Sequence, residues 1–287
     1  MHIQWYPGHM TKAMRMMQDN MRVVDCVIYV LDSRAVSSCL NPQFDKMIAA
    51  KPVLYVLNKS DLVEPSRAKD WCAYFASRGK CALAVSSVDG KQRTRILEAL
   101  RRINRDKLQA YAAKGVNKQI RCMVVGVPNT GKSTLINSLC GSKRAITGNR
   151  PGVTRGKQWV SLEQGVELLD TPGSLPPAFE EHRRATHLAF IVSIREEVLA
   201  LDELALELIA FFRDREPQRF CERYKLDAMD DDGVRVMEAV AQSRGFLLGK
   251  RGYDYDRTAR AIIDDFRKQR MGKIMLDDPP EDCDAQT

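Results

Sequence analysis

Eight residues near the middle of this sequence have the types and spacing of a phosphate-binding loop. Residues 126–133 read Gly-Val-Pro-Asn-Thr-Gly-Lys-Ser, the pattern G-x-x-x-x-G-K-S, between an apolar run and an apolar helical stretch. The glycines let the backbone wrap closely around phosphates, a helix N-terminus directs amide N–H groups at the anion, and Lys132 adds a point charge. Ser133 offers a hydroxyl to Mg²⁺. The predicted phosphate-binding residues are Asn129, Thr130, Gly131, Lys132, Ser133 and Thr134.

Two further polar segments predict that the bound base is guanine. Residues 58–61, Asn-Lys-Ser-Asp, end the apolar run PVLYVL, and residues 86–87, Ser-Ser, end the run CALAV. The Asp61 carboxylate can accept hydrogen bonds from N1–H and N2–H₂ of guanine, whereas adenine lacks both donors. An unpaired buried carboxylate costs about 1–3 kcal/mol per lost bond, so this contact favours GTP. Each segment alone is typical of a polar turn. Beside a phosphate loop, they predict GTP binding by Asn58, Lys59, Ser60, Asp61, Ser86 and Ser87.

Two other loops predict a magnesium site. Asp170-Thr-Pro-Gly173 ends the run VELL, where an aspartate can hold Mg²⁺ through water and the Gly173 N–H can contact the γ-phosphate. A simple Pro-Gly turn would have the same sequence. Thr154, in the segment Pro-Gly-Val-Thr-Arg, is placed to ligate Mg²⁺ only when the γ-phosphate is present. The predicted Mg²⁺ ligands are Ser133, Thr154 and Asp170, and Gly173 joins the GTP-binding residues.

Six short apolar runs rich in β-branched residues predict the strands that position these loops. Helical stretches such as 66–78 and 93–113 separate most of them, which predicts parallel βαβ units. Only a turn at Gly165 joins the last two runs, and so short a turn forces an antiparallel hairpin. We therefore expect an α/β fold with a six-stranded, mostly parallel sheet. The predicted strands are residues 26–31, 53–57, 81–85, 121–125, 158–162 and 166–169.

The sequence changes character after Gly173. Prolines interrupt it, and no convincing strand follows, whereas residues 196–213, 232–243 and 255–271 carry apolar residues at helical spacing. We expect the nucleotide-binding domain to cover residues 1–176 and a small all-α domain to cover residues 177–276. The acidic, proline-containing residues 277–287 are predicted to form a frayed tail.

Composition limits the class of protein. With 287 residues, 44% hydrophobic and 29% charged, the chain can bury a sizeable core. Its apolar runs fall far short of the ~20 residues that span a bilayer, and its N-terminus lacks the apolar core of a signal peptide. Its eight cysteines are scattered without C-x-x-C spacing. We expect a cytoplasmic, reduced protein with no membrane segment. The net charge of +8 favours a polyanionic partner such as nucleic acid.

The order of the motifs indicates a circular permutation. Ras-like GTPases begin with the phosphate loop and end with N-K-x-D and a serine-bearing loop, whereas here those last two come first. With Trp-Tyr-Pro-Gly-His-Met at residues 5–10, this order resembles the circularly permuted bacterial GTPases of the YlqF type, the ribosome biogenesis GTPase A family, over essentially the whole chain. The resemblance implies a Ras-like P-loop GTPase domain in a cytoplasmic protein. Its partner would be the large ribosomal subunit precursor, both rRNA and ribosomal proteins, whose late assembly it assists before release on GDP formation. Basic residues within 101–107 and 250–273 fit rRNA phosphate contacts, and they equally fit a solvated helix face.

The mechanism of hydrolysis has to differ from that of Ras. Ser174 follows Gly173 where many Ras-like proteins have the glutamine that orients water, so unassisted turnover is expected to be slow, by a factor of about 10³–10⁵. The resemblance implies His9 as the compensating catalytic residue beside Lys132 and Thr154, with stimulation by the ribosome. His9 fits the capping of the following helix equally well. The resemblance also implies that Asn129 binds K⁺ between phosphates, and the alternative is a side chain that only faces solvent.

Two other functions remain open from the sequence. One is a nucleotide-gated RNA- or ribosome-binding module with negligible catalysis, because the glutamine is missing. The other is a permuted GTPase that acts on the small subunit or on another RNA. A permuted GTPase with an N-terminal barrel and a zinc site does not fit, because the sequence has neither a barrel-length segment nor a Cys/His cluster. We expect a monomer.

Overall fold

The computed structural model describes residues 8–89, 92–141, 158–162, 165–175, 181–194, 200–249 and 252–280, with the backbone alone at residues 8–10 and 158. These residues form two compact units. The first unit holds the chain between Gln4 and Phe179 together with the C-terminal segment that starts at Met275. The second unit, here called the helical unit, lies between Glu180 and Ile274.

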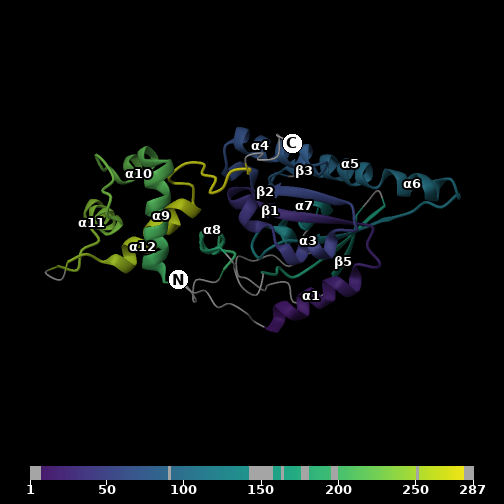
Figure 1. Ribbon diagram of the computed structural model, residues 1–287, viewed down its shortest axis with the longest axis horizontal. Coiled ribbons are helices and arrows are strands. Elements are labelled where there is room, and N and C mark those ends of the chain that lie inside the picture. Colours follow the sequence, from purple (N-terminus) through teal and green to yellow (C-terminus); the bar gives the residue numbers. More distant parts are fainter. Residues whose placement is uncertain are drawn as a thin grey trace, which may run out of the picture. The chain divides into compact units, whose positions relative to one another are not determined.

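The first unit is built on one six-stranded sheet with the order β3-β2-β1-β4-β6-β5 (Figure 1). Neighbouring strands are parallel except β5, which runs antiparallel to β6 at the edge. The predicted sheet is therefore confirmed, and each strand agrees with its predicted range to within one residue at either end. The strands are β1 (Cys26–Asp32), β2 (Val53–Asn58), β3 (Cys81–Ala84), β4 (Ile120–Val125), β5 (Gln158–Leu162) and β6 (Val166–Asp170).

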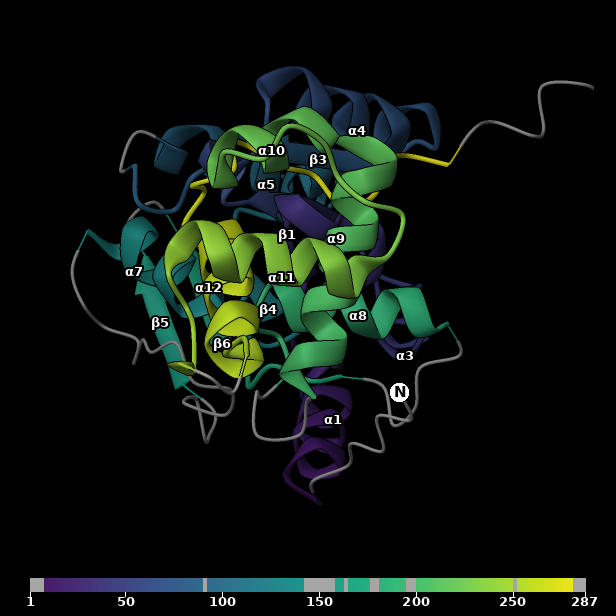
Figure 2. The same cartoon turned by 90° about the vertical axis from the view of Figure 1, so that its left-hand side faces the viewer.

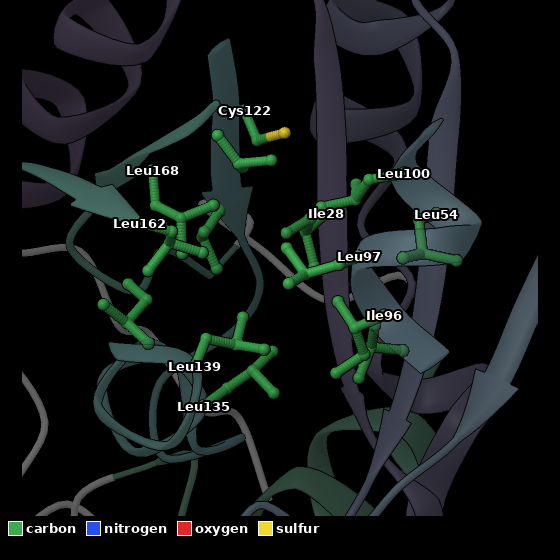
Figure 3. Packing of buried hydrophobic residues seen from close by; sticks show 14 of the residues in the cluster. Ile28, Leu54, Ile96, Leu97, Leu100, Cys122, Leu135, Leu139, Leu162 and Leu168 are labelled. Atoms are coloured by element: carbon green, nitrogen blue, oxygen red, sulfur yellow. The ribbon is translucent and has the colours of Figure 1, made fainter. Parts of the chain in front are cut away.

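One face of the sheet is covered by aliphatic side chains of two helices. Successive residues of a strand point to opposite faces, so Cys26, Ile28 and Val30 of β1 all lie on this side. They are buried in one cluster with residues of α5 (Arg93–Ile103) and α7 (Lys132–Cys140). Figure 3 shows Leu97 and Leu100 of α5 beside Ile28 and Leu54, and Leu135 and Leu139 of α7 below Leu162 and Leu168. The α7 helix, which starts at the phosphate loop, is thus anchored by its apolar side.

The opposite face of the sheet is covered by aromatic rings. Tyr29 of β1 stacks on Tyr55 of β2 with ring centroids 5.7 Å apart, and Tyr55 stacks on Phe75 at 4.5 Å. Phe44 packs edge-on against Tyr29. Phe44 belongs to α3 (Pro42–Ile48) and Phe75 to α4 (Pro65–Ser77), so these two helices cover this face. Both faces being buried explains why the strand sequences are continuously apolar.

The predicted helix 93–113 is two helices. Asn104 separates α5 from α6 (Arg105–Ala112), and its side-chain Nδ2 donates to the carbonyl of Leu100 at 2.8 Å. This local bond lets asparagine end one helix and start another. The remaining elements of the first unit are α1 (Gly8–Asn20), α2 (Val36–Cys39) and the 3₁₀ turns η1 (Ser33–Ala35) and η2 (Ser60–Leu62). Among the described helices, none has the length and apolarity to cross a bilayer.

The helical unit contains only helices and one isolated β-bridge among its described residues. The predicted helices correspond to α9, α11 and α12, and α9 packs against both others (Figure 2). The sequence analysis missed α8 and α10, each under ten residues long. Buried Asp265 of α12 binds Arg223 and Arg270 at 2.7 and 2.8 Å. The unit comprises α8 (His182–Phe190), α9 (Leu201–Arg215), α10 (Pro217–Tyr224), α11 (Gly233–Arg244) and α12 (Tyr255–Arg267).

The prediction of a frayed tail from residue 277 is wrong at its start. Asp277 is 2% exposed and accepts hydrogen bonds from the backbone N–H and the hydroxyl of Ser38, at 3.1 and 3.2 Å. The N–H of Leu276 donates to the carbonyl of Arg34 at 2.7 Å. We call residues 275–278 the C-terminal strap. Its acidic composition indicated a solvated tail, but the Asp277 carboxylate is used to bind α2. Residues 281–287 lie outside the described part of the chain.

Candidate nucleotide-binding site

The predicted site residues lie at one edge of the sheet, where the parallel strands end. β2 ends at Asn58, β4 at Val125 and β6 at Asp170, and each is followed by one of the predicted loops. β1 lies between β2 and β4, so the strand order reverses between β1 and β4. Open α/β sheets bind ligands outside the carboxyl ends of their strands at such a reversal. Topology therefore brings segments that are far apart in the sequence to one place.

The phosphate loop uses backbone conformations that favour glycine. Gly126 has φ +154°, and a Cβ there would overlap the carbonyl oxygen of Val30. Gly131 has φ +92°, and its Cβ would overlap the side-chain amide of Asn58. Asn129 has φ 60°, in the left-handed region that asparagine tolerates better than most residues. Both glycines are thus required by close approach to neighbouring loops as well as by their φ angles.

The Lys132 side chain lies along the inside of the phosphate loop. Its Nζ donates to the carbonyls of Gly126 and Val127 at 3.0 and 2.9 Å. Burial lowers its pKa to about 8, although nearby Asp170 acts in the opposite direction. A buried ammonium interacts more strongly with an anion than an exposed one, because less water screens it. Lys132 therefore has the placement and electrostatics that its predicted role requires.

Ser133 and Asp170 meet at the start of α7. The Ser133 hydroxyl donates to Oδ2 of Asp170 at 3.1 Å. Oδ1 of Asp170 is buried and has no hydrogen-bond partner among the described residues. Burial raises the pKa of Asp170 against the opposing effects of Lys132 and Ser133. A hydroxyl and a carboxylate with an unused oxygen are hard oxygen donors of the kind that Mg²⁺ prefers, so these two residues fit a magnesium ion.

Gly173 lies directly against the phosphate loop. A Cβ at this position would be 2.7 Å from Cα of Pro128 and 3.0 Å from Nζ of Lys132. Only glycine allows the backbone to come this close. The structure thus brings the D-T-P-G segment beside Lys132, the lysine predicted to bind phosphate.

Asn58 joins the phosphate loop to the serine loop. Its Nδ2 donates to the carbonyl of Thr130 at 2.8 Å. Its Oδ1 accepts from the backbone N–H and the hydroxyl of Ser87, at 3.1 and 2.7 Å. Asn58 is 1% exposed, so these bonds are shielded from water. One side chain therefore sets the spacing between the predicted phosphate and base subsites.

The predicted base-binding residues surround the end of β2. Asp61 is exposed, so its carboxylate is accessible to a ligand. The neighbouring Ser60 N–H donates to the carbonyl of Val85 at 3.0 Å. Ser86 and Ser87 are each 9% exposed. The Ser86 hydroxyl has no hydrogen-bond partner within the described residues. The N-K-S-D turn and the Ser-Ser loop are therefore held together by main-chain contacts.

Two charged residues beside the predicted Lys59, namely Asp32 and Arg34, were not singled out from the sequence. Lys59 has φ 58°, and its Nζ contacts the carbonyl of Asn129 at 2.6 Å and Oδ2 of Asp32 at 2.8 Å. Asp32 also binds Arg34 through two side-chain hydrogen bonds, of 2.9 and 2.8 Å. Asp32 ends β1 as Asn58 ends β2. The sequence did contain a signal for Asp32, which is a carboxylate directly after an apolar strand. Because the adjacent strand ends in a predicted site residue, Asp32 could have been expected at the same edge of the sheet.

Two predicted catalytic residues cannot be placed by the structure. Thr154 falls within 142–157, outside the described residues, and His9 lies in the first turn of α1 with its side chain outside the description. Ser174, at the position of the missing glutamine, is fully buried, and its hydroxyl has no partner in the described part of the chain. The described part of the chain therefore brings together the residues predicted to bind phosphate, magnesium and base, whereas Thr154 and the His9 side chain lie outside it.

Comparison with known proteins gives concordant matches. Residues 121–221 match the family model described as a 50S ribosome-binding GTPase. The chain is similar to ribosome biogenesis GTPase A of Bacillus cereus, with 38% identity over 98% of this chain and 95% of the relative. The Priestia megaterium protein of the same name is also 38% identical, over 98% of both chains. Among solved structures, YlqF from T. maritima bound to GNP matches with a TM-score of 0.67 and 25% identity, over 94% of this chain and 99% of that one.

Proposed function

This chain belongs to the ribosome biogenesis GTPase A family, and from that premise and the geometry of the site we infer that it is a GTP hydrolase that acts in ribosome assembly. The observation that carries the inference is the Asn58 side chain, which bonds both to the phosphate loop and to the loop predicted to read the base. We further propose that the partner is the large ribosomal subunit precursor. Hydrolysis would be stimulated by that particle, and GDP formation would release a monomeric, cytoplasmic protein.

The proposed roles follow the three subsites. Loop amides of residues 129–134 and the Lys132 ammonium bind the phosphates, while Asp61 accepts two hydrogen bonds from guanine. The Lys59 stem lies under the base because its ammonium is held by Asp32 and by the loop. The backbone N–H of Ser86 is proposed to meet guanine O6, and the next residue, Ser87, donates two hydrogen bonds to Asn58. This division of labour predicts GTP over ATP.

The proposed metal ligands are Ser133, Asp170 and Thr154. When bound, Mg²⁺ neutralises charge on the β- and γ-phosphate oxygens. Asp170 is suited to hold it because its carboxylate has a buried, unused oxygen. Asn129 is the proposed K⁺ ligand. Its main-chain oxygen is bound by Lys59, so the proposed ligand atom is the side-chain amide oxygen.

Slow intrinsic hydrolysis is expected from the surroundings of Gly173. The next side chain, Ser174, is fully buried and too short to reach a water on the γ-phosphate. The N–H of Gly173 contacts the γ-phosphate in this proposal, and Lys132 stabilises its developing charge. The water would be oriented by His9, whose imidazole can donate or accept a hydrogen bond near neutral pH.

We propose that α5 and α6 carry the surface that meets ribosomal RNA, and the distribution of charge supports this choice. Residues 181–274, which cover the helical unit, contain eighteen basic and eighteen acidic residues, so their net charge is zero. Residues 93–118 contain eight basic and two acidic residues, a net charge of +6 in a chain whose total is +8. They comprise α5, Asn104, α6 and the six residues after α6 in the first unit. Residues 93–112 alone, from the start of α5 to the end of α6, contain six basic and two acidic residues, a net charge of +4. The electrostatic attraction for an RNA backbone is therefore concentrated on α5–α6.

The contacts of the basic residues support the same choice. In the helical unit, Arg270 binds Asp265, Lys268 binds Asp264, and Arg267 donates to the carbonyl of Phe190 at 3.0 Å. On α5–α6, Lys107 binds Asp25 at 2.6 Å and Arg102 donates to Sγ of Cys81 at 3.0 Å. Arg101, Arg102 and Arg105 are all exposed to solvent. No residue of α6 is buried, and Figure 1 shows this helix continuing past the end of α5 at the periphery. So short a helix gains little from the protein core, which fits a role in contacting a partner.

GTP turnover tests the proposed function. It should be measured in K⁺ buffer with and without purified large ribosomal subunits, and with small subunits, ATP and Na⁺ as controls. The expected result is slow turnover of GTP alone and strong stimulation by large subunits only. Tight GTP binding with flat, slow turnover would instead identify a nucleotide-gated binding module, which the buried Ser174 also permits. Stimulation by small subunits would change the partner.

A charge-reversal series tests the RNA surface separately. The triple variant Arg101→Glu/Arg102→Glu/Arg105→Glu should weaken binding to large subunits and lower the salt dependence of log Kd by about one for each RNA phosphate that these arginines bind. The matched control, Arg235→Glu/Arg257→Glu/Arg260→Glu, makes the same charge change on exposed helices of the helical unit. If both triple variants weakened binding to large subunits equally, net charge alone would explain the effect. That result would contradict the assignment of the RNA surface to α5–α6.

A further inference from the structure

The base side of the site is held by a chain of buried charges. Asp32 is fully buried and accepts from both Lys59 and Arg34, at 2.8 Å for each closest contact. These paired cations hold the pKa of Asp32 well below its usual range despite its burial. Arg34 is itself 6% exposed and binds Asp32 with Nε and Nη2 together. Such two-pronged contacts fix direction as well as distance, so the position of Lys59 depends on that of Arg34.

The C-terminal strap holds the backbone of Arg34. Leu276 N–H donates to the Arg34 carbonyl at 2.7 Å, and the Asp277 carboxylate accepts from Ser38 in the next turn. On its other side, the strap is fixed to α4. The Trp71 indole N–H donates to the Asp277 carbonyl at 3.4 Å, and Arg67 forms an ion pair with Asp278. The segment η1–α2 is only seven residues long, too short to be stable without such partners.

We propose that the C-terminal strap is a positioning element of the guanine-binding site, acting through Arg34 and Asp32 on Lys59. The inference rests on the proposed function, because it requires a guanine nucleotide on Lys59. Release of the strap would free the Arg34 backbone, and Asp32 would then no longer hold the lysine ammonium in one place. By thermodynamic reciprocity, a nucleotide that orders Lys59 must also stabilise the strap.

The order of the chain gives this contact a consequence for the helical unit. Residues of that unit lie in sequence between Gly173, which contacts the phosphate loop, and the strap, which contacts the base side. The helical unit is therefore covalently connected, through the chain, to a segment at each half of the nucleotide site.

The test compares GDP with a ligand that lacks the base. Asp277→Ala removes the acceptor for Ser38, and Asp277→Asn restores an acceptor of the same size. We expect Asp277→Ala to weaken GDP binding about tenfold, which corresponds to about 1.4 kcal/mol, and Asp277→Asn to recover most of it. Binding of inorganic tripolyphosphate with Mg²⁺ should stay unchanged in both. Arg121→Gln is the matched control, because it removes an arginine–carboxylate pair with Glu167 at the opposite ends of strands in the same sheet.

Hydrogen exchange of the unaltered chain gives a second measurement that does not depend on the folding of a variant. The Leu276 N–H should exchange at least several-fold more slowly with GDP bound, and not with tripolyphosphate. Unchanged GDP affinity in Asp277→Ala, or equal losses for GDP and tripolyphosphate, would overturn the positioning role. If the unaltered chain did not bind GDP, the proposed function itself would be contradicted, and this inference would be contradicted with it.

Discussion

Replacing Asn58 by alanine should loosen the connection between the phosphate loop and the serine loop. The side chain makes three buried hydrogen bonds, one to the Thr130 carbonyl and two from Ser87. Without them, the Thr130 carbonyl and the Ser87 N–H lose a partner inside a site that admits little water, while the Ser87 hydroxyl can rotate. An unsatisfied buried polar group costs about 1–3 kcal/mol, so two backbone groups amount to about 2–6 kcal/mol.

Part of this free energy should appear in nucleotide binding. A bound nucleotide needs both loops in their native spacing, so the loops that relax in Asn58→Ala have to be ordered again on binding. If about half of the loss appears there, GDP affinity falls by about 1–3 kcal/mol, which is a factor of about five to about 150. The other half should appear as a lower melting temperature of the ligand-free chain.

Calorimetric titration with GDP, well below the melting transition, measures the binding part. Asn104→Ala is the matched control, because Asn104 is a second buried asparagine of this unit, 3% exposed and bonded to the Leu100 carbonyl. It should lower the melting temperature and leave GDP affinity unchanged. Native GDP affinity in Asn58→Ala, or an equal loss in Asn104→Ala, would refute the proposed connection between the loops.

Three other predictions concern titratable residues. The pKa of Lys132 is lowered to about 8, so its neutral form grows as pH rises and GDP affinity should fall about tenfold between pH 7 and pH 9. Over the range from about pH 8 to its unfolded pKa near 10.5, this lysine should increasingly stabilise the ligand-free chain. Equal GDP affinity at pH 7 and pH 9 would contradict this. Burial, helped by Arg183 and Arg215, lowers the pKa of His187 to about 4, so the helical unit should lose stability as pH falls from about 6.5 towards 4. Thermal melts should show that His187→Gln reduces this acid sensitivity, and an unchanged pH profile would argue against it. For His9→Ala, GTP titration should show native affinity while ribosome-stimulated turnover falls by about 10²–10⁴, and an unchanged stimulated rate would place the catalytic group elsewhere.

Much of the first unit could be predicted because its signals are local. A strand buried on both faces has to be continuously apolar, so the six runs located the strands to within one residue. The phosphate loop could be predicted for a similar reason, since the local backbone conformation sets the spacing of its glycines. The short helices α8 and α10 were missed because two turns give too little periodicity, and Asn104 divided a predicted helix through one side-chain bond.

Other features of the site depend on distant parts of the chain. Asp32 and Arg34 are ordinary polar residues in the sequence, and their role appears only when parallel strands bring Asp32 beside the end of β2 and Lys59. The strap is the clearest case. Asp277 looks like part of a solvated acidic tail, yet it is buried against Ser38, 239 residues away. Residue types determine which chemistry a side chain can perform, so the sequence alone was enough to predict that chemistry. Whether an acidic or basic side chain stays in water or becomes buried depends on which partners the fold places around it, because its contacts with water must be replaced by hydrogen bonds or by an opposite charge.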